Sequence, residues 1–257
     1  MPPRTMIELR TLGGLDLHDA QGRELRVILA ASKPAALLTY LAIATPRGFH
    51  RRDTLLALLW PELDQEHARG ALRQALYVIR RSMTAGALLT EGDDAIALDR
   101  DAFWCDAVAF ELLLDGGKPE EALALYRGAL LEGFHLSGCL EFERWLEDER
   151  LRLERRAAHA AWSLVEQAAA QGNLVKASEW ARRAAAIREA GGRGHVATRS
   201  ASLSRGTDGA GDAVGPTSPG VFSRGRGRVA ARHRAAGPLG RSGRRDPRVR
   251  GVRETAA

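Results

Sequence analysis

The chain has 257 residues and a formal net charge of +6, but this charge is unevenly distributed. Residues 1–190 carry 24 basic and 28 acidic side chains, whereas residues 191–257 carry 14 arginines and only 4 acidic side chains. No apolar run approaches the roughly 20 residues of a membrane helix, and the first residues lack the apolar stretch of a secretion signal. We therefore expect a cytoplasmic protein without a membrane partner.

The two cysteines, Cys105 and Cys139, are too few for a disulfide framework. Neither has a second Cys or a His at the spacing of metal ligands. We expect both to be small buried or half-buried side chains, and we expect no metal site.

Three short strands are predicted within residues 6–28, where apolar and polar side chains alternate. Gly13-Gly14 supplies a turn between the first two strands. The apolar positions of the three strands are Ile7 and Leu9, Leu15 and Leu17, and Leu25 and Val27.

From Ser32 the apolar spacing changes to that of a helix, with Ser32 as the predicted N-cap. This helix should end near Thr45-Pro46, because the residue before a proline disfavours helical geometry. A second helix is predicted over about 51–60, stopped by Pro61, and a third over about 64–83, where apolar side chains recur at three- and four-residue steps.

A hairpin is predicted after the third helix, from Leu88-Leu89, the turn at 91–94, and the alternating Ile96 and Leu98. Strands, three helices and a hairpin follow one another in the order of a winged helix. The predicted fold class is therefore α+β, with a winged-helix DNA-binding domain over residues 1–101.

From residue 106 to residue 190 the chain is predicted to be helical throughout, as an all-α domain over 102–190. Two stretches match helix hairpins of the tetratricopeptide (TPR) kind. Each places a small residue five positions after a Gly turn: Ala122 after Gly117, and Ala177 after Gly172. The helix between them, over 140–171, is predicted to turn these side chains inward: Phe142, Trp145, Leu146, Leu153, Trp162 and Val165.

Residues 191–257 contain 28 Arg or Gly residues, no Lys or Ile, and one aromatic residue, Phe222. So little apolar material cannot offset the entropy of ordering the chain. We predict a disordered tail.

The third helix carries the candidate functional residues. At about 100° per residue, four side chains fall within roughly an 80° sector outside the apolar face: Arg69, Arg73, Tyr77 and Arg80. Gln74 and Arg81 flank this sector. Arginine can pair with guanine or phosphate, and glutamine with adenine. Arginines just before and at the start of the second helix should contact the DNA backbone. The predicted DNA-binding residues are Arg47, Arg51, Arg52, Arg69, Arg73, Gln74, Tyr77, Arg80 and Arg81.

An ordinary solvated helix also carries exposed arginines, and Glu66 lies nearby. The place of this helix, third in the order of a winged helix, favours DNA binding over that interpretation.

The chain also resembles a known family. The runs FHRRDTLLALLWP at 49–61 and ARGALRQALYVIRR at 68–81 resemble the OmpR-type winged helix of the Streptomyces antibiotic regulatory protein (SARP) family. The segments at 104–106, 121–128 and 142–146 are similar to the bacterial transcriptional activator domain beside it in that family.

This resemblance covers about residues 6–187. It implies a transcription activator that binds direct repeats in double-stranded promoter DNA, often as a side-by-side pair, and contacts RNA polymerase. It places these residues on the recognition helix: Arg69, Arg73, Gln74, Tyr77 and Arg80.

Two features depart from the family. The hairpin tip at 91–94 is acidic, whereas the wing of such regulators usually offers a positive side chain to DNA. After 180–187 the repeat pattern calls for further helices, and the Arg/Gly-rich segment begins instead, so we expect the helical domain to be truncated. Two hypotheses for this segment stay open: an out-of-frame reading of a GC-rich gene, or a basic arm containing Arg224-Gly-Arg-Gly-Arg228.

No Gly-rich phosphate loop with its Lys and Ser/Thr occurs in the sequence. The charged residues at 141–154 alternate in sign at helical spacing, which is typical of a solvated helix face. We predict neither an enzyme nor a cofactor. Two alternatives to the activator remain: a TPR-like adaptor without specific DNA binding, and a truncated protein that binds DNA without activating.

Overall fold

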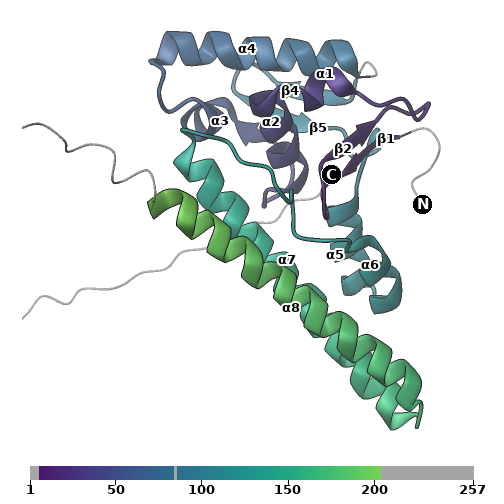
Figure 1. Cartoon of the computed structure of the whole chain (residues 1–257). Helices are drawn as coiled ribbons and strands as arrows, with labels where there is room; N and C mark the ends of the chain where they lie inside the picture. Colours follow the sequence, from purple (N-terminus) through teal and green to yellow (C-terminus); the bar gives the residue numbers. More distant parts are fainter. Residues whose placement is uncertain (1–5, 84–85, 204–257) are drawn as a thin grey trace, which may run out of the picture. The chain divides into compact units, whose positions relative to one another are not determined.

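The computed structural model describes residues 6–83 and 86–203, with side chains described as far as residue 190. Within these residues the chain is mixed α/β, with eight helices and two three-stranded sheets (Figure 1). Residues 204–257 of the predicted tail lie outside the described residues. Residues 191–203 continue the last helix, α8 (Leu174–Leu203), so the boundary predicted at residue 190 was placed too early.

The first sheet has the strand order β2-β1-β6. The predicted hairpin of β1 (Ile7–Arg10) and β2 (Asp16–His18) is confirmed as an antiparallel pair. On its other side, β1 pairs in parallel with β6 (Phe103–Cys105), a strand that was not predicted from sequence. This pairing joins the first described residues to the segment that follows the second hairpin.

The third strand predicted in residues 6–28 was wrong. A short helix, α1 (Arg26–Leu29), occupies that place, and only a single bridge, between His18 and Glu24, precedes it. The helix buries Ile28 and exposes Val27, whereas a strand would have buried Val27.

Three helices follow as predicted: α2 (Ser32–Ile43), α3 (Arg52–Leu59) and α4 (Gln65–Ser82). The predicted cap of the first was wrong. Ala31 is the N-cap residue of α2, Ser32 is already helical, and no side chain caps the end.

The second sheet has the strand order β3-β5-β4. The predicted hairpin is confirmed in β4 (Leu88–Glu91) and β5 (Ala95–Leu98). A two-residue strand, β3 (His50–Arg51), pairs with β5 and leads directly into α3. The predicted second helix therefore begins one residue later, after a short extended segment.

Four more helices follow: α5 (Asp106–Asp115), α6 (Pro119–Leu125), α7 (Leu140–Ala170) and α8. Gly117 and Gly172 lie in the turns between paired helices with φ of +71° and +72°, a conformation that favours glycine. Ala122 and Ala177 are buried in those pairs. Figure 1 shows α7 and α8 side by side, in agreement with their extensive contact.

Two predictions for the helical region were wrong. Residues 126–139 are not helical, because Gly133 and Gly138 take positive φ and the chain turns repeatedly. On α7, Phe142, Leu146 and Leu153 are buried as predicted, but Trp162 is 44% exposed.

Packing between the segments before and after β6 is direct. The Tyr40 ring of α2 lies 4.8 Å from the Trp145 ring of α7, centroid to centroid, and the Cys139 thiol donates to the carbonyl of Leu59 over 3.2 Å. Both cysteines are free and buried, as expected. None of the helices described within 6–83 and 86–203 combines the length and apolar character needed to cross a bilayer.

Candidate nucleic-acid interface

Helix α4 is fixed by its cap and by its apolar face. The Asp64 carboxylate accepts hydrogen bonds from the backbone N–H groups of Glu66 and His67 at 3.1 and 3.0 Å, which satisfies donors that the helix itself leaves open. The buried side of the helix consists of Ala68, Leu72, Ala75, Leu76 and Ile79. Because this side packs inward, the opposite side is held facing outward.

The outward side carries the predicted DNA-contacting residues, and all of them are exposed. We call this set the arginine face: Arg69, Arg73, Gln74, Tyr77, Arg80 and Arg81. Its first and last members, Arg69 and Arg81, are separated by about 18 Å along the helix axis. The sequence prediction of one amphipathic helix with an exposed basic side is confirmed.

Three guanidinium groups of the arginine face are unengaged. Within the described residues, Arg69, Arg73 and Arg80 form neither an ion pair nor a hydrogen bond. The Arg81 guanidinium donates to the Tyr77 hydroxyl over 2.9 Å, and the Tyr77 side chain is 54% exposed. Three positive charges therefore stand free on one helix side.

Two further predicted residues lie at the start of α3. Arg51 is exposed, while Arg52 is half-buried and its Nε is a buried donor without a partner among the described residues. The backbone N–H of Arg52 donates to the carbonyl of Asp94 over 2.8 Å, which ties this end of α3 to the turn of the hairpin.

The structure gives Arg47 a different role from the predicted one. Its guanidinium pairs with the Glu111 carboxylate of α5, and its side chain is only 24% exposed. Glu111 also pairs with Arg152 and with Arg156, the latter over 3.0 Å, both on α7. Arg47 therefore belongs to this Glu111 cluster and not to a free DNA-facing surface.

Burial and neighbouring positive charges shift the pKa of Glu111 in opposite directions. Burial raises the pKa of its carboxyl group, but the hydrogen bond and charge of Arg152, with the charges of Arg47 and Arg156, outweigh it and lower the pKa. Glu111 is thus held as a carboxylate in an almost enclosed position.

The Glu111 cluster was missed in the sequence. Arg152 and Arg156 stand four residues apart, and the charged stretch around them was predicted to be a solvated face. That prediction was partly wrong, because Glu149 is buried and pairs with Arg152 over 2.6 Å. Helical spacing marks the two arginines as neighbours, but no local pattern points to partners as distant as Arg47 and Glu111.

The tip of the β4–β5 hairpin is acidic and exposed: Glu91, Asp93 and Asp94. Three carboxylates at the tip would repel a phosphate backbone. Among the described residues, no group of three or more His, Cys, Asp or Glu side chains is placed to hold a metal ion.

Neither a protein-family model nor a curated protein matches this chain. The resemblance to the SARP family stays a prediction from sequence.

Proposed function

We propose that this protein is a sequence-specific DNA-binding transcription regulator that reads the major groove with α4. The observation that carries the proposal is the arginine face, where Arg69, Arg73 and Arg80 are exposed and unpaired on a helix that is 18 residues long. An α-helix fits the major groove of B-form DNA, and the forked donors of arginine match guanine O6 and N7.

The surrounding elements support a winged-helix interpretation. Helices α2, α3 and α4 precede the hairpin β4–β5, and α4 contacts both α2 and α3 through its apolar side. In helix-turn-helix domains the recognition helix inserts while the preceding helix faces the backbone. Arg51, exposed at the start of α3, is suited to that backbone contact.

The rest of the chain supports the finer assignment to an activator of the SARP type. The paired helices α5–α6 and α7–α8 each turn at a glycine and bury a small residue at their contact, as TPR-like hairpins do. By resemblance, this part would mediate contact with RNA polymerase and pairing of two copies on direct repeats. Such a regulator would act in the cytoplasm.

The acidic hairpin tip limits how the domain would dock. Because Glu91, Asp93 and Asp94 repel phosphate, we propose that the hairpin does not insert into the minor groove. Affinity then depends on α4 and the start of α3, which makes single arginine substitutions informative.

A second candidate function is a helical-repeat adaptor. Leu174 and Val175, at the start of α8, are 74% and 73% exposed, which is unusual for two adjacent apolar side chains and suits a protein partner. This candidate predicts protein capture with no preference among DNA sequences.

The test is selection of fragments from the source genome by the full chain, followed by affinity measurement on an enriched fragment. Arg73→Ala should lower specific affinity by about 5- to 150-fold, the loss expected for one base-reading arginine. Arg155→Ala is the matched control, because Arg155 is exposed and unpaired on α7 within the described residues.

Enrichment of no fragment above bulk DNA would overturn the proposal. Equal loss in Arg73→Ala and Arg155→Ala would show that α4 reads no sequence.

A further inference from the structure

A cavity of about 300 Å³ opens where the second sheet, the loop after α2 and helix α5 meet. This volume lies at the lower end of the range for small-molecule sites. Residues on both sides of the predicted domain boundary contribute to it: Leu41, Arg47, Leu98 and Arg100 from one side, and Phe103, Trp104, Val108 and Leu112 from the other.

The polar side chains that line this cavity are mainly hydrogen-bond donors. Among the residues that the structure describes, its only charged side chains are Arg47 and Arg100, and no Asp, Glu, Asn, Gln, Ser or Thr side chain lines it. The other polar side-chain groups described there are the Trp104 indole N–H and the Cys105 thiol, which can donate, and the Met6 thioether, a weak acceptor. The side chains therefore offer hydrogen-bond donors and positive charge.

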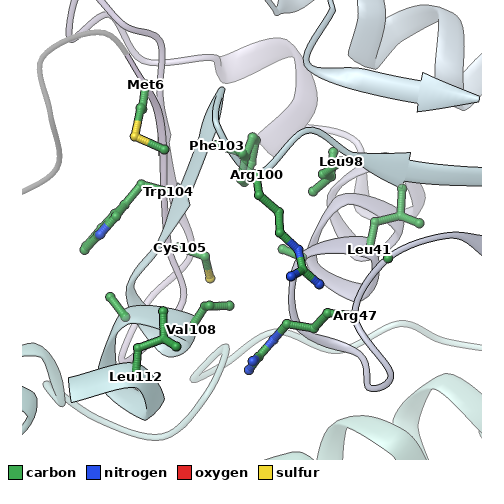
Figure 2. Close-up of a pocket in the computed structure, with 13 residues that line it drawn as sticks. Met6, Leu41, Arg47, Leu98, Arg100, Phe103, Trp104, Cys105, Val108 and Leu112 are labelled. Atoms are coloured by element: carbon green, nitrogen blue, oxygen red, sulfur yellow. The ribbon is translucent and has the colours of Figure 1, made fainter. Parts of the chain in front are cut away.

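Both arginines reach the same cavity. Figure 2 shows Arg100 extending toward Arg47, with Leu41 and Leu98 on one side and Cys105, Val108 and Leu112 on the other. Within the described residues Arg100 forms no ion pair, and the Nε of Arg47 is a buried donor without a partner. The unpaired charge of Arg100 and the free N–H of Arg47 favour a negative group that can also accept hydrogen bonds.

The net charge of the arginines at the cavity and their ion-pair partners is close to +1. Arg47, Arg152 and Arg156 are offset by Glu111, Glu149 and Asp115, with which they form ion pairs. Arg100 remains without such a partner in this part of the chain. A ligand with a single negative charge suffices, and the planar guanidinium matches a carboxylate.

We propose that this cavity binds a small molecule with an apolar body and one carboxylate group, seated against Leu41, Val108 and Leu112 with its carboxylate between Arg47 and Arg100. This site is separate from the arginine face of α4 and does not depend on DNA binding. Because both predicted domains line it, an occupied site would hold them together.

The test uses calorimetric titration of the full chain, without DNA, with octanoate and with octylamine, which has the same chain length and the opposite charge. Octanoate should saturate at one molecule per chain, and octylamine should not. Arg100→Gln should weaken octanoate binding by about tenfold or more, since a charged hydrogen-bond donor is lost. Arg155→Gln should leave it unchanged.

The proposal fails if octanoate binds no more tightly than octylamine, or if Arg100→Gln binds octanoate as the unmodified chain does. It also fails if Arg155→Gln loses as much affinity as Arg100→Gln, which would indicate general attraction to a basic protein. Arg100 is exposed, so this substitution does not disturb the core. None of these outcomes bears on the DNA-binding proposal, whose assay contains no octanoate.

Discussion

The guanidinium of Arg47 pairs with the carboxylate of Glu111, a residue 64 positions further along the chain. The pair joins the loop after α2 to helix α5, and Arg152 and Arg156 bring α7 into the same cluster. An arginine that local sequence assigns to a DNA surface is thus part of the packing between distant segments.

Arg47→Gln should lower the free energy of unfolding and leave DNA binding intact. The lost charged hydrogen bond is worth about 1–2 kcal/mol here, since Arg47 is partly exposed to solvent. Urea unfolding measures the free energy of unfolding, and DNA titration at several salt concentrations measures DNA affinity and its salt dependence. If Arg47→Gln reduced the salt dependence of DNA binding, Arg47 would contact the DNA backbone, contrary to this prediction.

Glu111→Gln should destabilise the protein by roughly 2–3 kcal/mol at neutral pH, somewhat less than for a fully buried ion pair. The pKa of Glu111 is lowered in the folded state, so its contribution is present above the ordinary value of 4.5 and is lost as the pH falls through the folded value. The difference in unfolding free energy between the two proteins should therefore shrink below about pH 4.5. A difference independent of pH between 3 and 7 would contradict this assignment.

Arg51→Gln should weaken binding to all DNA sequences alike. A phosphate contact carries no sequence information, and its loss should reduce the slope of log K against log salt by about 0.9. Fragments of different sequence, titrated at four or more salt concentrations, give this slope. If Arg51→Gln changes which fragments are preferred, Arg51 reads bases instead.

Ala122→Leu should destabilise the helical region by about 1–3 kcal/mol, because Ala122 on α6 is fully buried and a larger side chain in a close-packed interior forces its neighbours to shift. Ala124→Leu, two residues away and exposed on the same helix, should change stability by no more than about 0.5 kcal/mol. Thermal unfolding of the two variants compares them directly. Equal effects would show that α6 is not closely packed at Ala122.

The parts of the fold that local patterns determine were predicted from sequence. Pro61 stops α3, and the periodic apolar positions of α4 give both its length and its exposed side. The hairpin at 88–98 follows from alternation around a Gly-Asp turn. In each case the residues that determine the element lie within it or within a few residues of it.

The parts that depend on distant contacts were not predicted. Strand β6 has three residues and exists because Ile7 and Leu9 of β1 lie beside it. The irregular segment at 126–139 is held by Arg150 of α7, which donates to the carbonyls of Leu130 and Leu131 at 2.8 and 2.7 Å. Its glycines were a usable signal, and the all-helical prediction overlooked them.

For the candidate site, the sequence located the arginine face correctly on the exposed side of α4, and its role in DNA binding stays a prediction. It could not distinguish Arg47 from Arg51. Both precede α3, and only the fold shows that one meets a buried carboxylate while the other meets solvent.

The parallel pairing of β6 with β1 limits where the chain can be divided into fragments that fold. A fragment ending at residue 101 would leave one edge of β1 open and would also lose Asp106, whose carboxylate accepts from the backbone N–H groups of Thr11 and Leu12 over 2.7 and 3.0 Å. An open edge beside the apolar Ile7 and Leu9 invites aggregation. A fragment that keeps these contacts must therefore extend beyond residue 106, and the half that holds α4 depends on a strand encoded after its own hairpin.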